Sequence, residues 1–155
     1  MPAQPQDFMQ ITDCWTRNDL QGFLFREHCM RLLSGVKGYD WCGVYRLEGD
    51  TLLLDAFVGA ETQHTSIPVG RGVCGAAVAQ GKNQIVHDVA QRDDYLACGL
   101  ETKSEIVVLI RDNGTVIGQI DVDSHTVGTF SEADERFLEE LAGMLADRWA
   151  EGPQP

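Results

Sequence analysis

The sequence predicts an α+β domain in which helices pack on an antiparallel sheet. Short runs of alternating apolar and polar residues predict strands. Two pairs of these runs are joined by tight turns, at Glu48-Gly49-Asp50 and Asp112-Asn113-Gly114, and such turns connect antiparallel neighbours. Near the C-terminus, apolar residues recur at helical spacing and predict a helix that covers the sheet.

The length of 155 residues favours a single domain. We place it at residues 18–150, between an N-terminal segment, 1–17, that is loose at its start and a loose tail, 151–155.

Two helices and six strands are expected before residue 131. The side chain of Asn18 can cap a first helix that runs to about Ser34. Gly81 can end a second helix, made of small residues, at 73–80. Strands are expected at 39–47, 51–58, near 65–69, and at 84–87, 105–111 and 115–123, with a long surface loop at 88–103.

The last helix begins at Ser131, with Asp134 placed as a capping-box partner. Its apolar residues form one stripe that should face the sheet. The members of that stripe are Phe130, Ala133, Phe137, Leu141, Met144, Leu145 and Trp149.

Charge excludes several classes of partner. Lys and Arg number 12 against 24 Asp and Glu, so the net charge is −12. Such a surface repels nucleic-acid backbones and anionic membranes, and the sequence contains no stripe of Lys or Arg. We find neither a targeting segment nor a long apolar run, so we expect a cytoplasmic protein with reduced thiols.

Five cysteines are an odd number, which argues against a disulfide scaffold. Cys74 begins the small-residue helix near Arg71, where the helix dipole should lower the thiol pKa; the alternative is a small buried core residue. Cys98 lies in the predicted loop beside Gly99, where it is either a functional thiol or an incidental exposed one.

Three acidic residues can converge on one face of the sheet. Asp121 and Asp123 are two positions apart on a strand, so they share a face, and Glu105 lies opposite them across the Asn-Gly hairpin. Neighbouring carboxylates can share a proton or bind an ammonium group, although a solvated acidic face is the alternative. Trp41 and Tyr45 share a strand face and could wall such a pocket or simply belong to the core.

Two other motifs carry little weight. The spacing G-x-G-x-x-G at 70–75 lacks the surrounding strand-helix-strand context of a dinucleotide site. His64, His87 and His125 are scattered and form no pair at zinc-ligand spacing, so we expect no bound metal.

Taken together, four ordered blocks resemble the free methionine-(R)-sulfoxide reductases, a family of stand-alone GAF-domain proteins. The resemblance covers about residues 37–145. The blocks are Trp41-Cys42-Gly43-Val44-Tyr45, Ile67-Pro68-Val69-Gly70-Arg71-Gly72-Val73-Cys74-Gly75, Ala97-Cys98 with the following Ser104-Glu105-Ile106-Val107-Val108, and Ile120-Asp121-Val122-Asp123-Ser124.

The resemblance implies a GAF fold, a homodimer and reduction of free L-methionine-(R)-sulfoxide. It implies that Cys98 attacks the sulfoxide sulfur and becomes a sulfenic acid, which condenses with a second thiol to a disulfide. Thioredoxin or a similar dithiol would then reset the enzyme, with no bound cofactor. Glu105, Asp121 and Asp123 would hold the substrate ammonium and protonate the sulfoxide oxygen, between walls formed by Trp41 and Tyr45.

The chain departs from the family pattern at two places. His64 stands where the family commonly has a third cysteine, so the second thiol is Cys74 or comes from outside. Gly99 replaces the usual acidic neighbour of the nucleophile. Both departures favour an alternative function, a non-catalytic GAF module that binds a small ligand or senses thiol oxidation.

The three other cysteines are not expected to take part in the reaction. Cys42 lies on the strand face opposite Trp41 and is expected in the core, whereas Cys14 and Cys29 have no assigned role. The first and last helices are the expected dimer surface.

Overall fold

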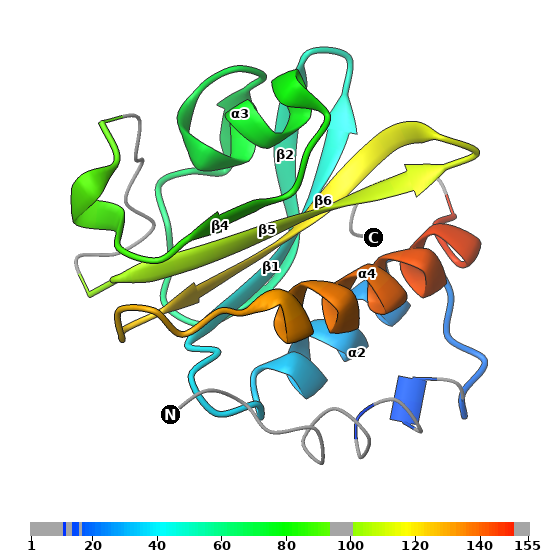
Figure 1. Ribbon diagram of the computed structural model, residues 1–155. Coiled ribbons are helices and arrows are strands. Elements are labelled where there is room, and N and C mark those ends of the chain that lie inside the picture. The colour runs from blue at the N-terminus through cyan, green and yellow to red at the C-terminus, as the bar shows by residue number, and fades with distance from the viewer. Residues whose placement is uncertain (1–10, 12–13, 16, 94–100, 151–155) are drawn as a thin grey trace.

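Two long hairpins form the middle of a six-stranded antiparallel sheet. The computed structural model describes residues 11, 14–15, 17–93 and 101–150 (Figure 1). The strands lie in the order β3-β2-β1-β6-β5-β4. Their bounds are β1 Trp41–Glu48, β2 Thr51–Val58, β3 Ser66–Pro68, β4 Gln84–Val86, β5 Ser104–Asp112 and β6 Thr115–Ser124. The expected α+β class and the antiparallel sheet are confirmed.

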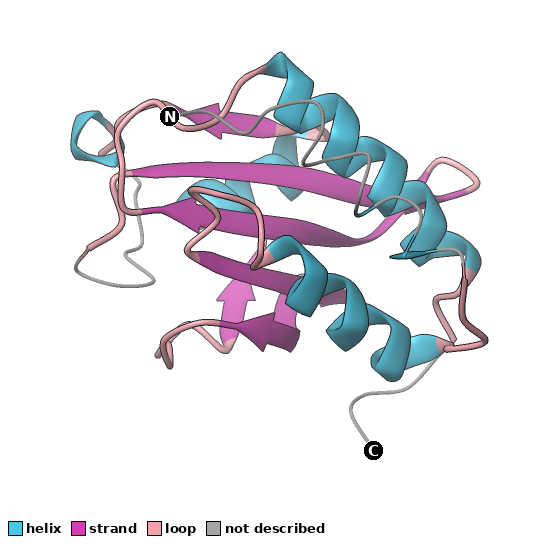
Figure 2. Cartoon of the chain, turned by 90° about the horizontal axis from the view of Figure 1, so that it is seen from below, coloured by secondary structure: helices cyan, strands magenta, loops and turns pink. Residues whose placement is uncertain are grey.

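The helices lie on both faces of this sheet. Helices α2 (Gly22–Leu33) and α4 (Glu132–Asp147) lie side by side on one face, as Figure 2 shows. Helix α3 (Gly72–Gln80) covers part of the opposite face, and a short 3₁₀ turn, η1 (Val89–Gln91), precedes β5 (Figure 1). The described part of the chain is therefore a three-layer arrangement with the sheet in the middle.

An apolar core fills the space between the sheet and the pair α2 and α4. The strands contribute the residues that alternate toward that side, and the two helices contribute their apolar stripes. Fully or nearly fully buried members include Phe25, Cys29, Leu33, Cys42, Val44, Ile106, Ile120, Val122, Phe137, Leu138, Leu141 and Leu145.

One residue of the predicted α4 stripe is placed wrongly. Phe130, Phe137, Leu141 and Leu145 are buried, and Met144 and Trp149 are partly buried, but Ala133 is exposed. The neighbouring Asp134 takes the buried position instead, because its carboxylate accepts hydrogen bonds from the Tyr39 hydroxyl and from the Ser131 backbone N–H. The second of these bonds confirms the expected cap of α4.

The predicted start of the first helix is also wrong. Helix α2 begins at Gly22 rather than just after Asn18, and Gly22 itself has a φ of +59°. The Asn18 side chain instead donates to the Trp15 carbonyl and accepts from the Leu20 N–H, so it closes a turn and caps no helix there. Trp15 is fully buried and stacks on Phe137 with ring centroids 5.0 Å apart, a core contact that periodicity did not reveal.

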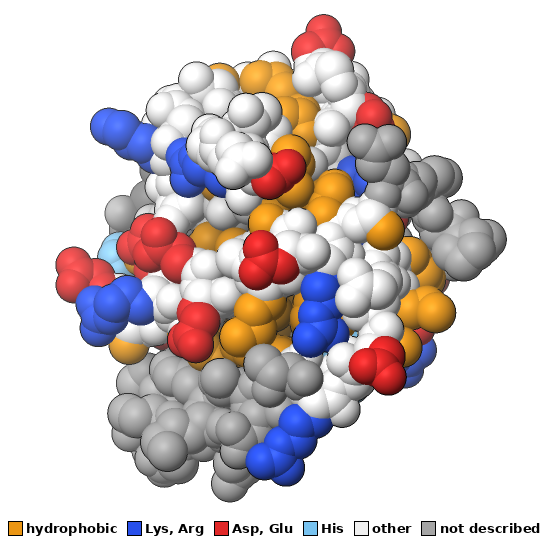
Figure 3. Space-filling view, turned by 90° about the vertical axis from the view of Figure 1, so that its right-hand side faces the viewer, with side chains coloured by type: hydrophobic (Ala, Val, Ile, Leu, Met, Phe, Trp, Pro, Cys, Tyr) orange, Lys and Arg blue, Asp and Glu red, His pale blue; other side chains and the backbone are white. Residues whose placement is uncertain are grey.

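The charged side chains on the face shown in Figure 3 are interspersed. Lys and Arg lie among Asp and Glu there, and neither sign forms a continuous patch on that face. Within the described residues, none of the helices has the length and apolar character needed to cross a bilayer.

Candidate active site

The β5–β6 hairpin brings three carboxyl groups together. Asn113 and Gly114 both have positive φ, which is the backbone of a tight two-residue turn between antiparallel strands. This turn, together with a register shift between Ile110 and Arg111, gives a pairing in which Glu105 faces Asp123 and Val107 faces Asp121. Glu105, Asp121 and Asp123 are 2%, 0% and 1% exposed, so the alternative of a solvated acidic face is wrong.

Burial changes the protonation of this cluster. The pKa of Glu105 is raised well above its usual value by burial and, further, by the neighbouring charges of Asp121 and Asp123. Burial also raises the pKa of Asp121, while hydrogen bonds from Glu105 and Cys74 act in the opposite direction. The cluster therefore retains protons at a pH where exposed carboxyl groups have lost theirs.

Cys74 meets this cluster from the other layer. It lies in the first turn of α3, is only 5% exposed, and its Sγ is 3.9 Å from Glu105 Oε2. The buried side chain of Gln119, on β6, donates a hydrogen bond of 3.2 Å to the Cys74 carbonyl. Backbone and thiol are thus both held against the β5–β6 hairpin.

The glycines before and after Cys74 allow this approach. Gly72 has a φ of +66° at the start of α3. A Cβ atom on Gly75 would lie 2.6 Å from the Pro68 carbonyl oxygen, and the Gly75 carbonyl accepts a hydrogen bond from the Gly70 N–H. The spacing of glycines at 70–75 therefore serves close packing of α3 on the turn after β3.

Two aromatic residues line the same side of the sheet as the carboxyl groups. Trp41 and Tyr45 are almost completely buried in the smaller apolar cluster under α3. The Trp41 ring lies over Gly43, where a Cβ would be 2.5 Å from the ring, and Nε1 donates to the Ala60 carbonyl at 3.0 Å. The predicted alternation is confirmed, since Cys42 belongs to the core on the opposite face.

His64 occupies the loop between β2 and β3. Its carbonyl accepts a hydrogen bond of 2.8 Å from the Tyr45 hydroxyl, and its backbone N–H donates to the Thr62 hydroxyl at 3.0 Å. The backbone at this position is therefore tied to the aromatic strand β1, whatever side chain the residue carries. Cys98, together with Gly99, lies outside the described residues.

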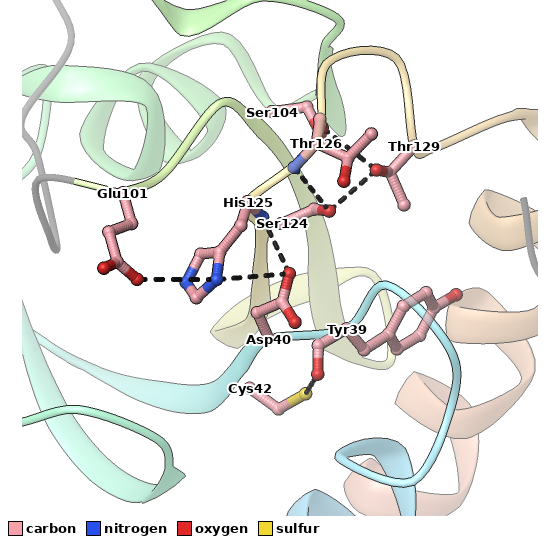
Figure 4. A network of polar contacts seen from close by, with 9 residues as sticks. All are labelled: Tyr39, Asp40, Cys42, Glu101, Ser104, Ser124, His125, Thr126 and Thr129. Carbon is pink, nitrogen blue, oxygen red and sulfur yellow. Dashed lines mark hydrogen bonds and ion pairs between the residues drawn. The ribbon is translucent and has the colours of Figure 1, made fainter. Parts of the chain in front are cut away.

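A polar network at the end of β6 was not foreseen from the sequence (Figure 4). The backbone N–H of His125 donates to Asp40 Oδ2 at 2.7 Å, and its Nδ1 lies 3.8 Å from that oxygen and 3.6 Å from Glu101 Oε2. The Asp40 N–H in turn donates to the Asp123 carbonyl at 2.9 Å. Because Asp40 and His125 are 85 residues apart, spacing gave no signal for their contact.

The other described cysteines lie away from the cluster. Cys42 is fully buried, and burial raises its pKa well above the usual value, which supports the expected core role. Cys29 is buried in the same core, and its pKa is raised to about 12 by burial. Cys14 is exposed.

One group of described residues has the geometry to hold a metal ion. The ligand atoms of Cys74, Glu105 and Asp121 lie within 4.8 Å of one another. The same three groups also hydrogen-bond one another, which accounts for their closeness without an ion. The expectation that the protein needs neither metal nor cofactor stays a prediction.

Comparison with known proteins supplies the family. A family model described as GAF domain matches residues 27–148. The free methionine-R-sulfoxide reductase of Escherichia coli is 42% identical over 114 residues, which cover 74% of this chain and 68% of that relative. The chain belongs to the free methionine-R-sulfoxide reductases, a family with the GAF fold.

Solved structures of the family have the same fold. A type II free methionine-R-sulfoxide reductase from Thermoplasma acidophilum is 40% identical with a TM-score of 0.77, over 81% of this chain and 89% of that one. The Neisseria meningitidis reductase, solved in complex with its substrate, is 32% identical with a TM-score of 0.84, over 96% and 93% of the two chains. The resemblance inferred from the four sequence blocks is confirmed.

Proposed function

We propose that this protein is a thiol-dependent enzyme that reduces free L-methionine-(R)-sulfoxide to methionine. The observation that carries the proposal is the buried group of Glu105, Asp121, Asp123 and Cys74, which places acid groups beside a thiol. The E. coli relative has this activity in its name, and the N. meningitidis relative was solved with its substrate.

The carboxyl groups have two tasks in this proposal. An amino acid loses hydration when it enters a buried site, so its ammonium group needs an ionised carboxylate as partner. The sulfoxide oxygen needs a proton before the S–O bond can break. A cluster that shares protons among Glu105, Asp121 and Asp123 can supply both a charge and a proton. Trp41 and Tyr45 wall the pocket.

The redox steps balance with two thiols. The Cys98 thiolate attacks the sulfoxide sulfur, the protonated S–O bond breaks, methionine forms in the site, and the oxygen remains on Cys98 as a sulfenic acid. The sulfur of the substrate is reduced by two electrons, and the sulfur of Cys98 is oxidised by two. The Cys74 thiol then displaces the sulfenic hydroxyl, which leaves as water, and a Cys74–Cys98 disulfide forms. A thioredoxin-like dithiol reduces this disulfide.

His64 stands at the third-cysteine position, and Cys29 and Cys42 are buried in the core on the opposite side of the sheet. Cys74 is therefore the partner that we propose for Cys98 within the chain, and an outside thiol is the alternative. We further propose that the enzyme acts in the cytoplasm as a homodimer that pairs through its first and last helices, and that it needs no bound cofactor.

The decisive assay uses the two free sulfoxide epimers separately, with dithiothreitol as reductant and methionine as the measured product. Wild-type protein should convert the (R) epimer alone, and Cys98→Ser should reduce the rate to background. Cys14→Ser, which alters an exposed thiol, is the matched control and should retain the wild-type rate. Full activity in Cys98→Ser would contradict the assignment, and binding without any methionine would indicate the non-catalytic GAF module.

A further inference from the structure

The Cys74 thiol also donates a hydrogen bond to the carboxyl groups of the site, independently of any disulfide. Its Sγ is 3.9 Å from Glu105 Oε2, and the Asp121 carboxyl also accepts a hydrogen bond from it. Because Gln119 holds the Cys74 carbonyl and Gly75 packs against Pro68, the first turn of α3 is fixed over these carboxyl groups. The thiol therefore faces the carboxyl groups as a donor, and not merely as a neighbour.

A donor at this point changes how the carboxyl groups ionise. A hydrogen bond to a carboxylate favours its charged form, whereas burial disfavours it. Among the described residues, Glu105 on β5 and Asp121 and Asp123 on β6 are the buried charged groups that lie on the sheet face under α3. Strand β3, which also contacts α3, contributes no charged residue. On the α3 side, the charged residue near Cys74 in the chain is Arg71, which is the N-cap residue of the helix. On the described parts of β3, β5 and β6, the buried titratable groups under α3 are thus acidic.

We propose that the Cys74 thiol positions the ionised carboxylates for the substrate ammonium, so that oxidation of this thiol weakens the hold of the site on the amino acid. The inference rests on the proposed function and deepens it. Cys74 acts here through Glu105 and Asp121, without touching the substrate.

The chemistry of the disulfide step gives this donor a role in the cycle. When the Cys74 sulfur bonds to the Cys98 sulfenic acid, the sulfenic hydroxyl takes up the thiol proton and leaves as water. The disulfide has no S–H group, so Glu105 and Asp121 lose a donor at the moment when the product is present. Methionine is therefore released more readily from the oxidised enzyme, and the reducing dithiol restores the tight-binding state.

The test separates hydrogen-bond donation by the Cys74 thiol from its part in disulfide formation. In a Cys98→Ser background, which cannot turn over, calorimetry measures binding of free L-methionine-(R)-sulfoxide to the parent and to variants with Cys74→Ala or Cys74→Ser added. Alanine removes the donor, and the dissociation constant should rise roughly three- to tenfold at pH 6.5. Serine keeps a donor and should stay within about twofold of the parent.

The pH dependence distinguishes this role from simple packing. At pH 8.5 the carboxyl groups ionise more readily even without a hydrogen-bond donor, so the loss of affinity caused by Cys74→Ala should be smaller than at pH 6.5. Cys29→Ala is the matched control, because it also removes a buried thiol but in the core on the opposite face of the sheet, and its binding constant should not change. A second measurement keeps Cys74: wild-type enzyme oxidised by one equivalent of sulfoxide should bind methionine more weakly than reduced enzyme.

Several results would overturn the inference. These are equal binding by the alanine variant, the serine variant and the parent, a loss that does not change with pH, or equal methionine binding by oxidised and reduced wild-type enzyme. Failure of the proposed function is a different result, namely that wild-type protein produces no methionine. Absence of binding to the Cys98→Ser parent would contradict both.

Discussion

The two faces of the sheet are built from the same strands but differ in chemistry. On β6, Ile120 and Val122 point into the apolar core under α2 and α4, whereas Asp121 and Asp123 point toward α3. Strand β5 repeats the contrast, with Ile106 on the core side and Glu105 on the other. Adjacent residues of one strand thus belong either to the apolar core or to the buried carboxyl cluster, according to whether their position is odd or even.

The contrast shows where stability is gained and where it is lost. Burial of apolar side chains under α2 and α4 stabilises the fold, at roughly 1.5–3 kcal/mol for each large side chain. Burial of three carboxyl groups on the α3 face opposes folding unless they are protonated or paired. The face under α2 and α4 supplies apolar burial that stabilises the fold, whereas the buried carboxyl groups on the α3 face oppose folding when they are charged and unpaired.

The largest expected effect comes from a change on the α3 face. Glu105→Gln removes the acid group that shares protons with Asp121 and Asp123, so kcat/KM for the free sulfoxide should fall at least about thirtyfold. That loss corresponds to about 2–5 kcal/mol of transition-state stabilisation. The melting temperature should not fall, because a neutral amide avoids the desolvation of a carboxylate. Steady-state kinetics and thermal unfolding of the same preparation measure both.

A matched control for that variant is Glu139→Gln, which removes a carboxylate from the exposed side of α4. Its kinetics should equal those of the wild type. A melting temperature of Glu105→Gln far below that of the wild type would show that the cluster serves folding, and the contrast between the faces would break.

A change on the sheet face under α2 and α4 should lower stability and leave the kinetics of the folded enzyme unchanged. Leu138 is fully buried on α4, and Leu138→Ala should lower the free energy of unfolding by about 2–5 kcal/mol through lost burial and a cavity. The KM of the folded enzyme should stay unchanged, since Leu138 lies across the sheet from the carboxyl groups. Urea unfolding measures the first quantity and steady-state kinetics the second.

Leu24→Ala serves as the comparison, because Leu24 is 54% exposed on α2 and its loss should cost less than about 0.5 kcal/mol. An unchanged free energy of unfolding in Leu138→Ala would contradict the role given to this face.

The smallest expected effect, counted per pH unit, is the pH dependence of stability. Because the pKa of Glu105 and that of Asp121 are raised in the folded protein, the folded state keeps protons that the unfolded chain releases above its ordinary values of 4.5 and 3.8. The stability contributed by these groups is present below those values and is lost as the pH rises, by at most ~1.4 kcal/mol per pH unit for each group.

Urea unfolding between pH 5 and pH 8 measures this slope for the wild type and for Glu105→Gln. The difference between the two slopes isolates the cluster from the other carboxyl groups of the protein. Stability should fall less steeply in the variant, and identical slopes would mean that Glu105 does not retain its proton on folding.

Much of the fold followed from local patterns. The turns at Gly49 and at Asn113-Gly114, the alternation of β1, the cap at Ser131 and the end of α3 at Gly81 all agree with their predicted places. Each depends on interactions within a few residues. The start of α2 and the exposure of Ala133 did not follow, because the Asn18 side chain bonds to its own turn and Asp134 is drawn inward by Tyr39.

Part of the site was also within reach of the sequence. The recognisable turn brings Glu105 near Asp121 and Asp123, but symmetric counting about it places Glu105 opposite Val122. The register shift between Ile110 and Arg111 moves Glu105 opposite Asp123 and onto the face of the two aspartates. The network of Asp40, Glu101 and His125 was out of reach, since its members come from three segments that only the folded chain brings together (Figure 4).

By itself, the sequence determined the α+β class, the family and the three carboxyl groups of the hairpin, because period, turn type and motif are properties of neighbouring residues. Only the tertiary structure decided that these carboxyl groups are buried and that Cys74, 31 residues from Glu105, donates to them from another layer. Burial and contact between layers depend on how α3 packs on β5 and β6. That packing sets the protonation of the cluster, and no local pattern encodes it.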